Sequence, residues 1–555
     1  MRRPIVILSL VSVMLLEARQ PVLTRHAMVT AQEPLAADIG VEVLKAGGNA
    51  IDAAVAVGFA LAVTHPFAGN LGGGGFLLAR FADGRTTFID FREAAPGAAS
   101  RNMYLDANGQ PTRDSIEGWR AAGVPGTVRG FELAHEKYGR KSWSELARPA
   151  VELARNGFPV SYGLAESLKG AKHLANFPES RRIFLKSGSF YDVDEVLRQP
   201  ELARTLDRIA RLGANEFYRG ETAKTLAAEM KKNGGLITLA DLEEYRALER
   251  KPLEGDYRGY HLITSPPPSS GGVGILQMLG MLENSGYEKP GWGAAATIHY
   301  MAEVMRRYYA DRSEYLGDPD FYKVPVRGLL DPAYIRRRAA SIDRDHATPS
   351  DQIGPGQLPR AESTETTHFN VVDSEGNAVA VTYTLNGGYG NGVTVPGLGF
   401  LLNNEMDDFA AKPGEANMFG LVQGEANAIA PHKRPLSSMT PTIVTRDGKL
   451  AMVLGAPGGS RIITAVMQVF LNVVDFGMNV QDAVDAPRFH HQWKPDRLEF
   501  ERGYSPDTIA LLKQRGHNIE DLKYTVIARV DAIRLDQGWL VGGSDGRGLG
   551  KAAGY

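Results

Sequence analysis

The sequence predicts an α+β fold in which layers of helices cover β-sheets. From about residue 127 to residue 245 apolar residues recur at helical spacing, most clearly in "TVRGFELAHEKYG", "SELARPAVELARNG" and "TAKTLAAEMKKNGG". Strand patterns dominate the second half, in "THFNVVD", "NAVAVTYTL", "PTIVTRDGKLAMVLGAPGG" and "YTVIARVDAIRLDQGWLVGGSD". The 555 residues suffice for two or more domains or for one large layered core. Helices followed by strands favour sheets that are covered by helices.

The N-terminus has the layout of a secretory signal. Arg2 and Arg3 precede the apolar run "PIVILSLVSVMLL" at 4–16, which is too short for a bilayer span of roughly 20 residues. We therefore expect residues 1–20 to be a signal peptide and the protein to be exported, to the periplasm or the extracellular space. An uncleaved signal would anchor it to the membrane. The following "EARQPV" lacks a clean small-x-small cleavage triplet, so a buried N-terminal strand is the alternative.

Two helices and a pair of strands are expected next. "PLAADIGVEVLKAGGNAIDAAVAVGFALAVTHP" at 34–66 reads as one helix that ends at Gly47-Gly48 and a second, almost entirely apolar helix. "NLGGGGFLLARF" and "RTTFIDFREAAP" then predict strands on either side of a turn at 82–84.

Two stretches rich in breaking residues divide the chain. "SPPPSSGG" at 265–272 is typical of a rigid loop. Residues 336–364 are polar and contain several breakers, and we expect them to be exposed and flexible. We expect the loop near 340–365 to be the main boundary in the chain.

The stretch "ESTETTHFNVVDSEGNAVAVTYT" at 362–384 predicts a β-hairpin with a defined register. Ser374-Glu375-Gly376 suits a type I turn followed by a left-handed glycine. This turn places Asp373 opposite Asn377, Phe369 opposite Val381, Thr367 opposite Tyr383, and Thr366 opposite Thr384. One face is then apolar and the other small and polar, and the two opposed threonine hydroxyls can interact. Threonine is also a common strand residue, so this pairing alone does not indicate a function.

Composition excludes several classes of function. A net charge of -2 gives no basic excess to attract nucleic acid, so we expect no nucleic-acid partner. The absence of cysteine excludes disulfides, thiolate catalysis and cysteine-type zinc sites. The "FHHQW" stretch at 489–493 could suggest a metal site, but neighbouring residues of a strand point to opposite faces. We therefore expect His490 and His491 to pack rather than bind metal, and we expect no cofactor.

Several long motifs resemble those of γ-glutamyltranspeptidases (glutathione hydrolases). They are "GGNAIDAAVAVGFALAVTHPFAGNLGGGGF", "DFREAAP", "TTHFNVVD", "NAVAVTYTLN", "LLNNEMDDF", "KRPLSSMTPTIV" and "GAPGGSRIIT", and the resemblance runs from about residue 27 to Tyr555. It implies an N-terminal nucleophile hydrolase with a four-layer αββα sandwich. It also implies a precursor that cuts itself between Glu365 and Thr366. The products would be a large subunit, 27–365, and a small subunit, 366–555, which form one intertwined heterodimeric core.

The resemblance implies that Thr366 is the nucleophile. A threonine hydroxyl needs a base, and a free N-terminal amine with an ordinary pKa of about 7.7–8.0 can serve on the same residue. Activity is therefore expected only after processing. The γ-glutamyl group of glutathione or a similar donor would be transferred to Thr366, and then to water or to the amine of an amino acid or peptide.

Further roles come by motif match. Arg92, with Ser437 and Ser438, corresponds to the residues that bind the substrate α-carboxylate. Glu405 and Asp408 correspond to the acceptors of the α-ammonium, with Asn386 nearby. Gly458 and Gly459 correspond to the oxyanion hole, and Thr384 to the residue that supports Thr366.

Each of these residues has a structural alternative. Arg92 could form an ion pair with Glu93 or another acid, the acidic run at 405–408 could be a solvated face, and the serine pair could be ordinary loop chemistry. A phosphate-binding loop is disfavoured, because no Lys-Ser or Lys-Thr follows either glycine-rich stretch.

The stretch "AKPGEANMFGLVQG" at 411–424 matches the lid loop of the family. Many bacterial relatives carry a gating tyrosine where this chain has Phe419. A phenyl ring can shield the site but cannot donate a hydroxyl hydrogen bond to Asn386, so the balance between hydrolysis and transfer stays open.

Two other functions remain open at this stage. One is a glutaryl-cephalosporin-type acylase or a polyglutamate-processing transferase of the same fold. The other is a non-catalytic binding protein that uses the same pocket without processing. Retention of Glu405, Asp408 and a lid-like loop favours a substrate with an α-ammonium over a glutaryl substrate.

Overall fold

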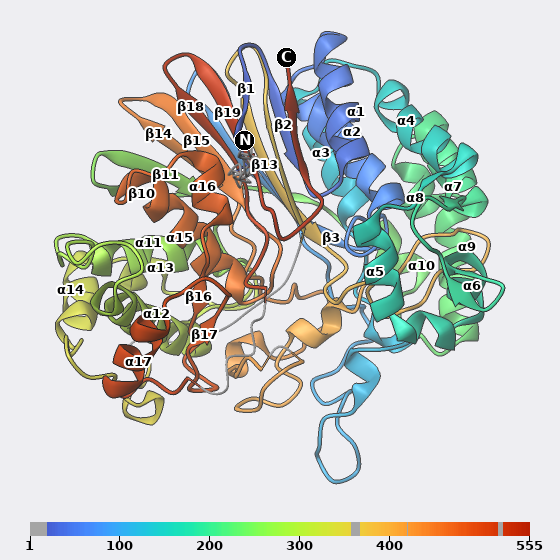
Figure 1. Cartoon of the computed structure of the whole chain (residues 1–555). Helices are drawn as coiled ribbons and strands as arrows, with labels where there is room; N and C mark the ends of the chain where they lie inside the picture. Colours follow the sequence, from blue (N-terminus) through green and yellow to red (C-terminus); the bar gives the residue numbers. More distant parts are fainter. Residues whose placement is uncertain (1–18, 357–366, 419, 520–525) are drawn as a thin grey trace, which may run out of the picture.

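Two seven-stranded antiparallel sheets lie face to face in the centre of the molecule, and helices cover the outer face of each (Figure 1). The computed structural model describes residues 19–356, 367–418, 420–519 and 526–555. The expected αββα order is therefore confirmed. The expectations for the signal segment up to residue 18, for Glu365 and Thr366, and for Phe419 lie outside the described residues.

The first sheet has the strand order β1-β19-β18-β15-β14-β11-β10. Its strands are β1 (Val22–Thr24), β19 (Trp539–Ser544), β18 (Asp531–Asp536), β15 (Lys449–Gly455), β14 (Thr442–Arg446), β11 (Tyr260–Thr264) and β10 (Leu253–Tyr257).

The second sheet has the order β20-β2-β12-β13-β3-β4-β9. Its strands are β20 (Lys551–Gly554), β2 (Met28–Ala31), β12 (Thr367–Val372), β13 (Ala378–Thr384), β3 (Gly74–Arg80), β4 (Thr86–Phe91) and β9 (Leu248–Arg250). Three short strand pairs lie outside the sheets: β5 (Phe158–Pro159) with β8 (Val196–Leu197), β6 (Leu185–Lys186) with β7 (Ser189–Phe190), and β16 (Phe489–His490) with β17 (Glu499–Phe500).

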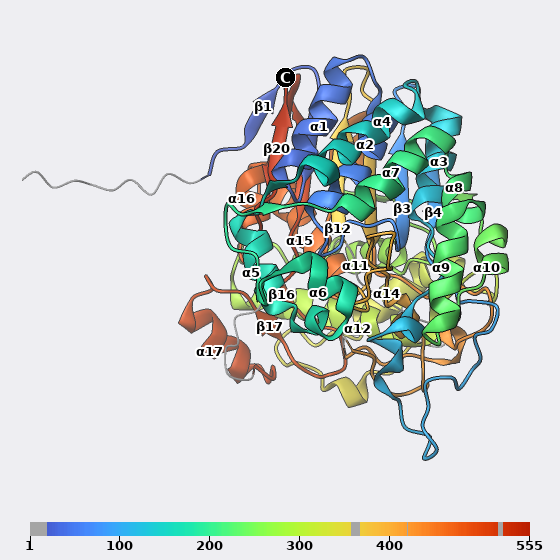
Figure 2. The same cartoon turned by 90° about the vertical axis from the view of Figure 1, so that its right-hand side faces the viewer.

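The helices divide between the two outer layers (Figures 1 and 2). The layer on the second sheet contains α1 (Pro34–Lys45), α2 (Ala50–Thr64), α3 (Thr127–Tyr138), α4 (Trp143–Asn156), α5 (Tyr162–Gly170), α6 (Pro178–Phe184), α7 (Pro200–Leu212), α8 (Asn215–Arg219), α9 (Glu221–Lys232) and α10 (Leu239–Glu244). The other layer contains α11 (Gly271–Leu282), α12 (Ala295–Tyr315), α13 (Val326–Leu329), α14 (Pro332–Ala340), α15 (Arg461–Val474), α16 (Val480–Asp485) and α17 (Pro506–Gln514). No helix of the described residues is both long enough and apolar enough to cross a membrane.

Short 3-10 helices lie in the segments that connect these elements. They are η1 (Arg113–Ser115), η2 (Trp119–Ala121), η3 (Lys172–Asn176), η4 (Ser350–Gln352), η5 (Glu405–Asp408) and η6 (Glu425–Asn427).

Three apolar cores fill the three interfaces between the layers. One core joins the second sheet to its helices, one joins the first sheet to its own helices, and a third lies between the sheets. Along β13, Val379, Val381 and Tyr383 face the helices, whereas Ala378 and Ala380 face the first sheet. Both faces of the strand are buried, which explains its nearly continuous apolar character.

The two predicted helices at 34–66 are confirmed as α1 and α2. A capping box between Asn49 and Asp52 starts α2, and all of its residues are buried. A Cβ at Gly58 would lie 2.3 Å from the ring of Phe131, so glycine allows α3 to pack closely against α2.

The predicted hairpin register is confirmed for the described residues. Thr367 pairs with Tyr383 and Phe369 with Val381, and Gly376 adopts a left-handed φ of 87°. The Asp373 N–H donates to the carbonyl of Asn377 at 3.1 Å, which closes the turn. The pairing of Thr366 with Thr384 lies outside the described residues.

The polar face of the hairpin is buried between the two sheets. His368 is hydrogen-bonded to Thr382 at 2.9 Å and to Asn370 at 2.8 Å. Asn370 in turn donates to the backbone carbonyl of Asp531 in β18 at 3.0 Å. This face therefore fixes the hairpin to the first sheet by a connected polar network.

The expectation of a flexible loop over 336–364 is wrong for its first residues. Residues 336–340 belong to α14, which Asp331 caps and Pro332 opens. Arg338 forms an ion pair of 2.8 Å with the buried Asp311. The arginine-rich run is therefore helical. The sequence pattern did not predict this helix, because it does not show that Tyr334 and Arg338 pack against the protein.

Both sheets combine strands from before and after residue 365. In the second sheet β12 and β13 lie between β2 and β3, and in the first sheet β14 and β15 lie between β18 and β11. The two halves of the chain form one intertwined core.

The buried Asp531 predicts a pH-dependent stability. Burial raises its pKa to about 7, so the stability associated with its protonated form is complete below its ordinary pKa and is lost as the pH rises through 7. Asp531→Asn cannot ionise, so we expect its free energy of unfolding to rise relative to that of wild type as the pH increases. Between pH 5 and pH 8 this relative gain should be on the order of 2–3 kcal/mol. Thermal unfolding at both pH values measures this difference. Asp536→Asn, at the exposed end of the same strand, is the control and should show no such pH dependence.

Candidate active site

The start of β12 and the ends of its neighbours meet at one edge of the second sheet. Thr384, the last residue of β13, pairs with Gly74 at the start of β3, and Gly75 pairs with Phe91 at the end of β4. Arg92, the residue after β4, therefore lies at the same edge of the sheet as Thr367, the first residue of β12. The sequence motifs, far apart along the chain, converge here.

Arg92 lies at the centre of a buried cluster of charges. Its guanidinium forms ion pairs with Glu405 and Asp408, and one of its nitrogens is 3.7 Å from Glu93. The Arg92 Nε–H also donates to the carbonyl of Pro435 at 3.1 Å. All four charged side chains are completely buried, so the acidic run is not a solvated face.

The cluster contains more acid than base. One guanidinium faces three carboxyls, and burial raises the pKa of Glu93 to about 7 and the pKa of Glu405 well above its ordinary value. The cluster therefore holds a proton near neutral pH. An ammonium group placed beside these carboxyls would favour their ionised forms.

Ser437 and Ser438 lie next to this cluster. The Arg92 guanidinium donates to the carbonyl of Leu436 at 3.3 Å, which places the serine pair beside it. Ser438 Oγ accepts a hydrogen bond of 2.8 Å from Arg312, and the Ser437 carbonyl accepts one of 2.7 Å from the Ser270 N–H. Both serines are completely buried.

Arg312 is a neighbour of the candidate site that the sequence analysis missed. It lies in α12 within "RRYYADRSEY", and besides Ser438 it donates to Ser270 Oγ at 3.0 Å. The only signal was a run of charges in a helix, which usually marks a solvated face. Here that part of α12 is buried.

Thr384 and Asn386 connect the strand edge to the acidic segment. Thr384 Oγ accepts a hydrogen bond of 2.7 Å from the Asn386 N–H, and Asn386 Nδ2 donates to the Asn404 carbonyl at 3.0 Å. Asn386 adopts a left-handed φ of 70°. Its buried Oδ1 has no hydrogen-bond partner among the described residues, so it is an available acceptor.

Gly458 and Gly459 lie between the end of β15 and the start of α15. Their φ angles are 141° and 66°, and a Cβ at Gly458 would lie 2.6 Å from the Cα of Ala528. Within the described residues neither N–H donates to a protein acceptor. Both glycines follow closely after Gly455, the last residue of β15, where a Cβ would lie 2.3 Å from the ring of His368 near the start of β12.

The described part of the 411–424 segment lies close to this network. The Met418 N–H donates to Asp407 at 3.2 Å, and Asn404 Nδ2 approaches Met418 Sδ at 3.6 Å. The segment thus contacts the same loop that carries Glu405 and Asp408.

His490 and His491 make hydrogen bonds to protein groups. His490 is bonded to Thr464 at 2.9 Å and His491 to Asp496 at 3.2 Å. Burial lowers the pKa of His490 to about 3 and that of His491 to about 4, so both rings are neutral. These contacts agree with a packing role. The described residues hold no group of three or more side chains suited to binding a metal.

Comparison with known proteins decides the family. The family model described as Gamma-glutamyltranspeptidase matches residues 36–555. The chain belongs to the γ-glutamyltranspeptidase family. The glutathione hydrolase proenzyme of Escherichia coli (strain K12), a relative in this family, is 52% identical over 539 residues, which cover 96% of this chain and 93% of the relative.

Solved structures share the fold of this γ-glutamyltranspeptidase family chain. Cephalosporin acylase from Bacillus halodurans has a TM-score of 0.87 at 29% identity and covers 99% of both chains. Helicobacter pylori γ-glutamyltranspeptidase has a TM-score of 0.58 at 49% identity and covers 59% of this chain and 95% of that chain. The resemblance read from the motifs is thus confirmed.

The charge cluster predicts a strong effect of Arg92 on stability. Arg92→Gln removes the guanidinium that pairs with Glu405 and Asp408, and breaking a buried ion pair typically costs about 3–5 kcal/mol. We expect a clearly lower Tm, partly restored when Asp408→Asn is added to Arg92→Gln. Arg85→Gln, which removes an exposed ion pair with Asp83, is the control and should leave the Tm nearly unchanged. Equal Tm values for Arg92→Gln and Arg85→Gln would contradict the prediction.

Proposed function

We propose that the protein is a self-processing γ-glutamyltransferase and glutathione hydrolase. The observation that carries this proposal is the buried cluster of Arg92, Glu405 and Asp408 beside Thr384 and the serine pair. A γ-glutamyl group carries an α-carboxylate and an α-ammonium, and it needs a cation and anions at one end of its binding site. The cluster supplies both, and family membership supports the same reading.

Processing would cut the chain between Glu365 and Thr366. Thr366 Oγ adds to the carbonyl carbon of Glu365, the peptide C–N bond breaks, and the hydroxyl proton passes to the nitrogen, which becomes a free amine. Water then hydrolyses the resulting ester. A large subunit, 27–365, and a small subunit, 366–555, would stay together as a heterodimer, because both sheets combine strands from both segments.

The free amine of Thr366 would then act as the base for its own hydroxyl. Oγ attacks the γ-carbonyl carbon of the donor, the amide C–N bond breaks, and the proton passes to the leaving amine. The N–H groups of Gly458 and Gly459 would donate to the oxygen of the tetrahedral intermediate. Water, or the amine of an amino acid or peptide, resolves the ester on Thr366.

The α-carboxylate of the donor would bind to Arg92 with Ser437 and Ser438. Arg312 positions Ser438 through the hydrogen bond that its Oγ accepts. The α-ammonium would bind to Glu405 and Asp408, and the free Oδ1 of Asn386 offers a further acceptor. Because a bound ammonium favours ionised carboxyls, binding would release the proton that the cluster holds.

Export is a further part of this proposal. The basic residues Arg2 and Arg3 and the apolar run at 4–16 support a signal segment within 1–20.

An acylase of the same fold is the second candidate. The high similarity to a cephalosporin acylase structure favours it. A glutaryl group lacks the α-ammonium, however, and would leave Glu405 and Asp408 without a cationic ligand. The three carboxyls around Arg92 therefore favour the γ-glutamyl substrate.

Intact mass spectrometry tests processing and the nucleophile together. We expect wild type to give two chains, the smaller one beginning at Thr366, and Thr366→Ala to give a single chain. A threonine hydroxyl is required for both cleavage and catalysis, so the uncut variant should also be inactive. Thr364→Ala is the matched control and should be processed normally. A cut at another bond would contradict the proposal.

Two anilide substrates test the substrate class. The ammonium of a γ-glutamyl group can form charge-assisted hydrogen bonds worth about 1.5–3 kcal/mol, which corresponds to about 10–100-fold. We expect kcat/KM to be higher by this factor for a γ-glutamyl anilide than for a glutaryl anilide. Asp408→Asn should narrow the ratio. Equal or faster turnover of the glutaryl anilide would favour the acylase.

A further inference from the structure

A cavity of about 700 Å³ lies on the other side of β12 from the Arg92 cluster. In the second sheet β12 is flanked by β13 and, on its other edge, by β2. The cluster belongs to the β13 side, since Arg92 follows β4. The cavity belongs to the β2 side, because Gln32 and Glu33, which follow β2, line it.

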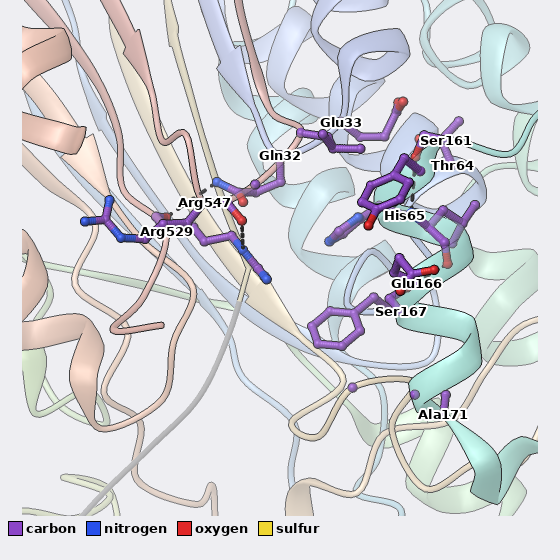
Figure 3. Close-up of a pocket in the computed structure, with 18 of the residues that line it drawn as sticks. Gln32, Glu33, Thr64, His65, Ser161, Glu166, Ser167, Ala171, Arg529 and Arg547 are labelled. Atoms are coloured by element: carbon purple, nitrogen blue, oxygen red, sulfur yellow. Dashed lines mark hydrogen bonds between the residues drawn. The ribbon is translucent and has the colours of Figure 1, made fainter. Parts of the chain in front are cut away.

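The cavity is built from both helices and sheet edges. Figure 3 shows Arg529 and Arg547 on the side of the sheets, and Ser161, Glu166 and Ser167 of the α5 region on the other side. Phe67 and Leu549 supply apolar surface. A ligand here would meet an apolar wall with a few fixed polar groups, as is usual for small-molecule sites.

Arg529 is a half-buried cation, and its terminal guanidinium nitrogens donate to no acceptor among the described residues. Its Nε–H donates to the carbonyl of Arg547 at 3.3 Å, and no carboxylate of the described residues lies within ion-pair distance of it. The neighbouring Arg547 differs, because it is paired with Asp545 at 2.9 Å and with Glu501 at 2.6 Å. Burial lowers the pKa of Arg529, and the more distant charge of Asp545 opposes this effect only in part.

The other titratable groups of the cavity do not neutralise Arg529. Burial, together with the nearby Arg529 charge, lowers the pKa of His65 to about 4, so His65 is neutral. Glu33 caps α1 through the Ala36 N–H at 3.2 Å, and burial raises its pKa to about 7. Glu166 is paired with Lys169 at 3.3 Å. Among the described residues the guanidinium therefore has no carboxylate within ion-pair distance, and the carboxylate of a ligand fits this position.

We propose that this cavity binds the amine-bearing partner of the γ-glutamyl group, with Arg529 pairing the carboxylate of that partner. The inference rests on the proposed function. It assigns amino acids and short peptides with a free carboxylate to the cavity. The amine that leaves the donor and the amine that accepts the glutamyl group must occupy the same position, because one reaction is the reverse of the other. One cavity therefore serves the leaving group of glutathione and the acceptor.

The transfer step is balanced. The acceptor nitrogen bonds to the γ-carbonyl carbon, the ester bond to Thr366 Oγ breaks, and a proton moves from the nitrogen to the hydroxyl through the Thr366 amine. Arg529 takes no part in bond making and is a specificity-determining residue.

Arg529→Gln tests the inference with two acceptors that differ only in charge. A guanidinium–carboxylate pair is worth about 1.5–3 kcal/mol, which corresponds to about 10–100-fold. We expect the KM for glycylglycine to rise by this factor, and the KM for glycylglycine amide to change less than about 3-fold. Arg529→Lys should give an intermediate value. Arg534→Gln is the matched control, because Arg534 lies in β18, shortly after Arg529, and its side chain is 32% exposed beside Asp536. This variant should leave both KM values unchanged.

Hydrolysis of the donor alone distinguishes a failure of the proposed function from a failure of the role assigned to Arg529. A γ-glutamyl anilide has no carboxylate on its leaving group, so its hydrolysis should be the same in wild type and Arg529→Gln. Absence of this hydrolysis in wild type would refute the proposed function itself. An active variant with the same loss for both acceptors, or with no loss, would overturn the assignment of Arg529. If Arg529→Gln does not fold, the wild type still tests the inference. Equal KM values of the wild type for glycylglycine and for glycylglycine amide would overturn the assignment of Arg529.

Discussion

The buried guanidinium of Arg92 is the interaction on which the candidate site depends. It holds together segments that lie more than 300 residues apart, through ion pairs with Glu405 and Asp408 and hydrogen bonds to the carbonyls of Pro435 and Leu436. Burying charges is costly unless each has a partner. The cluster has three carboxyls for one guanidinium, so it must hold a proton until a cation arrives. This excess of buried carboxyls lowers the stability of the ligand-free protein, and it favours the binding of a ligand with an ammonium group.

The hairpin β12–β13 lies between the two proposed binding sites and holds the start of β12 in place. Its apolar face packs on the helices, and its polar face is bonded to the first sheet through His368 and Asn370. With both faces covered, neither strand can shift by one residue without exposing polar groups to apolar surroundings. The proposed nucleophile, Thr366, directly precedes β12 in the sequence, and a fixed strand end suits this role because a small displacement of reacting groups lowers the rate strongly.

Local pattern predicted much of this structure. Helical spacing, the turn at Gly376 and the strand alternation gave α2 and the hairpin register, since these depend on neighbours in the sequence. The four-layer order and the convergence of Arg92 with Glu405 came from the family resemblance, because long-range contacts leave no periodic signal. Arg312 and the start of α14 were missed for a related reason. Charged residues usually mark a solvated surface, and only the packed structure shows that these face protein.

The two guanidiniums at this sheet edge differ in their surroundings, and on the proposed roles this difference would set the orientation of a bound substrate. Arg92 is surrounded by carboxyls and therefore suits a group that carries both charges, such as the amino-acid end of a γ-glutamyl compound. Arg529 has no carboxylate within ion-pair distance among the described residues and suits a lone carboxylate. A peptide with a zwitterionic end and an anionic end can satisfy both only in one orientation. That orientation places its γ-amide between the two sites, beside the start of β12, where the proposed nucleophile belongs.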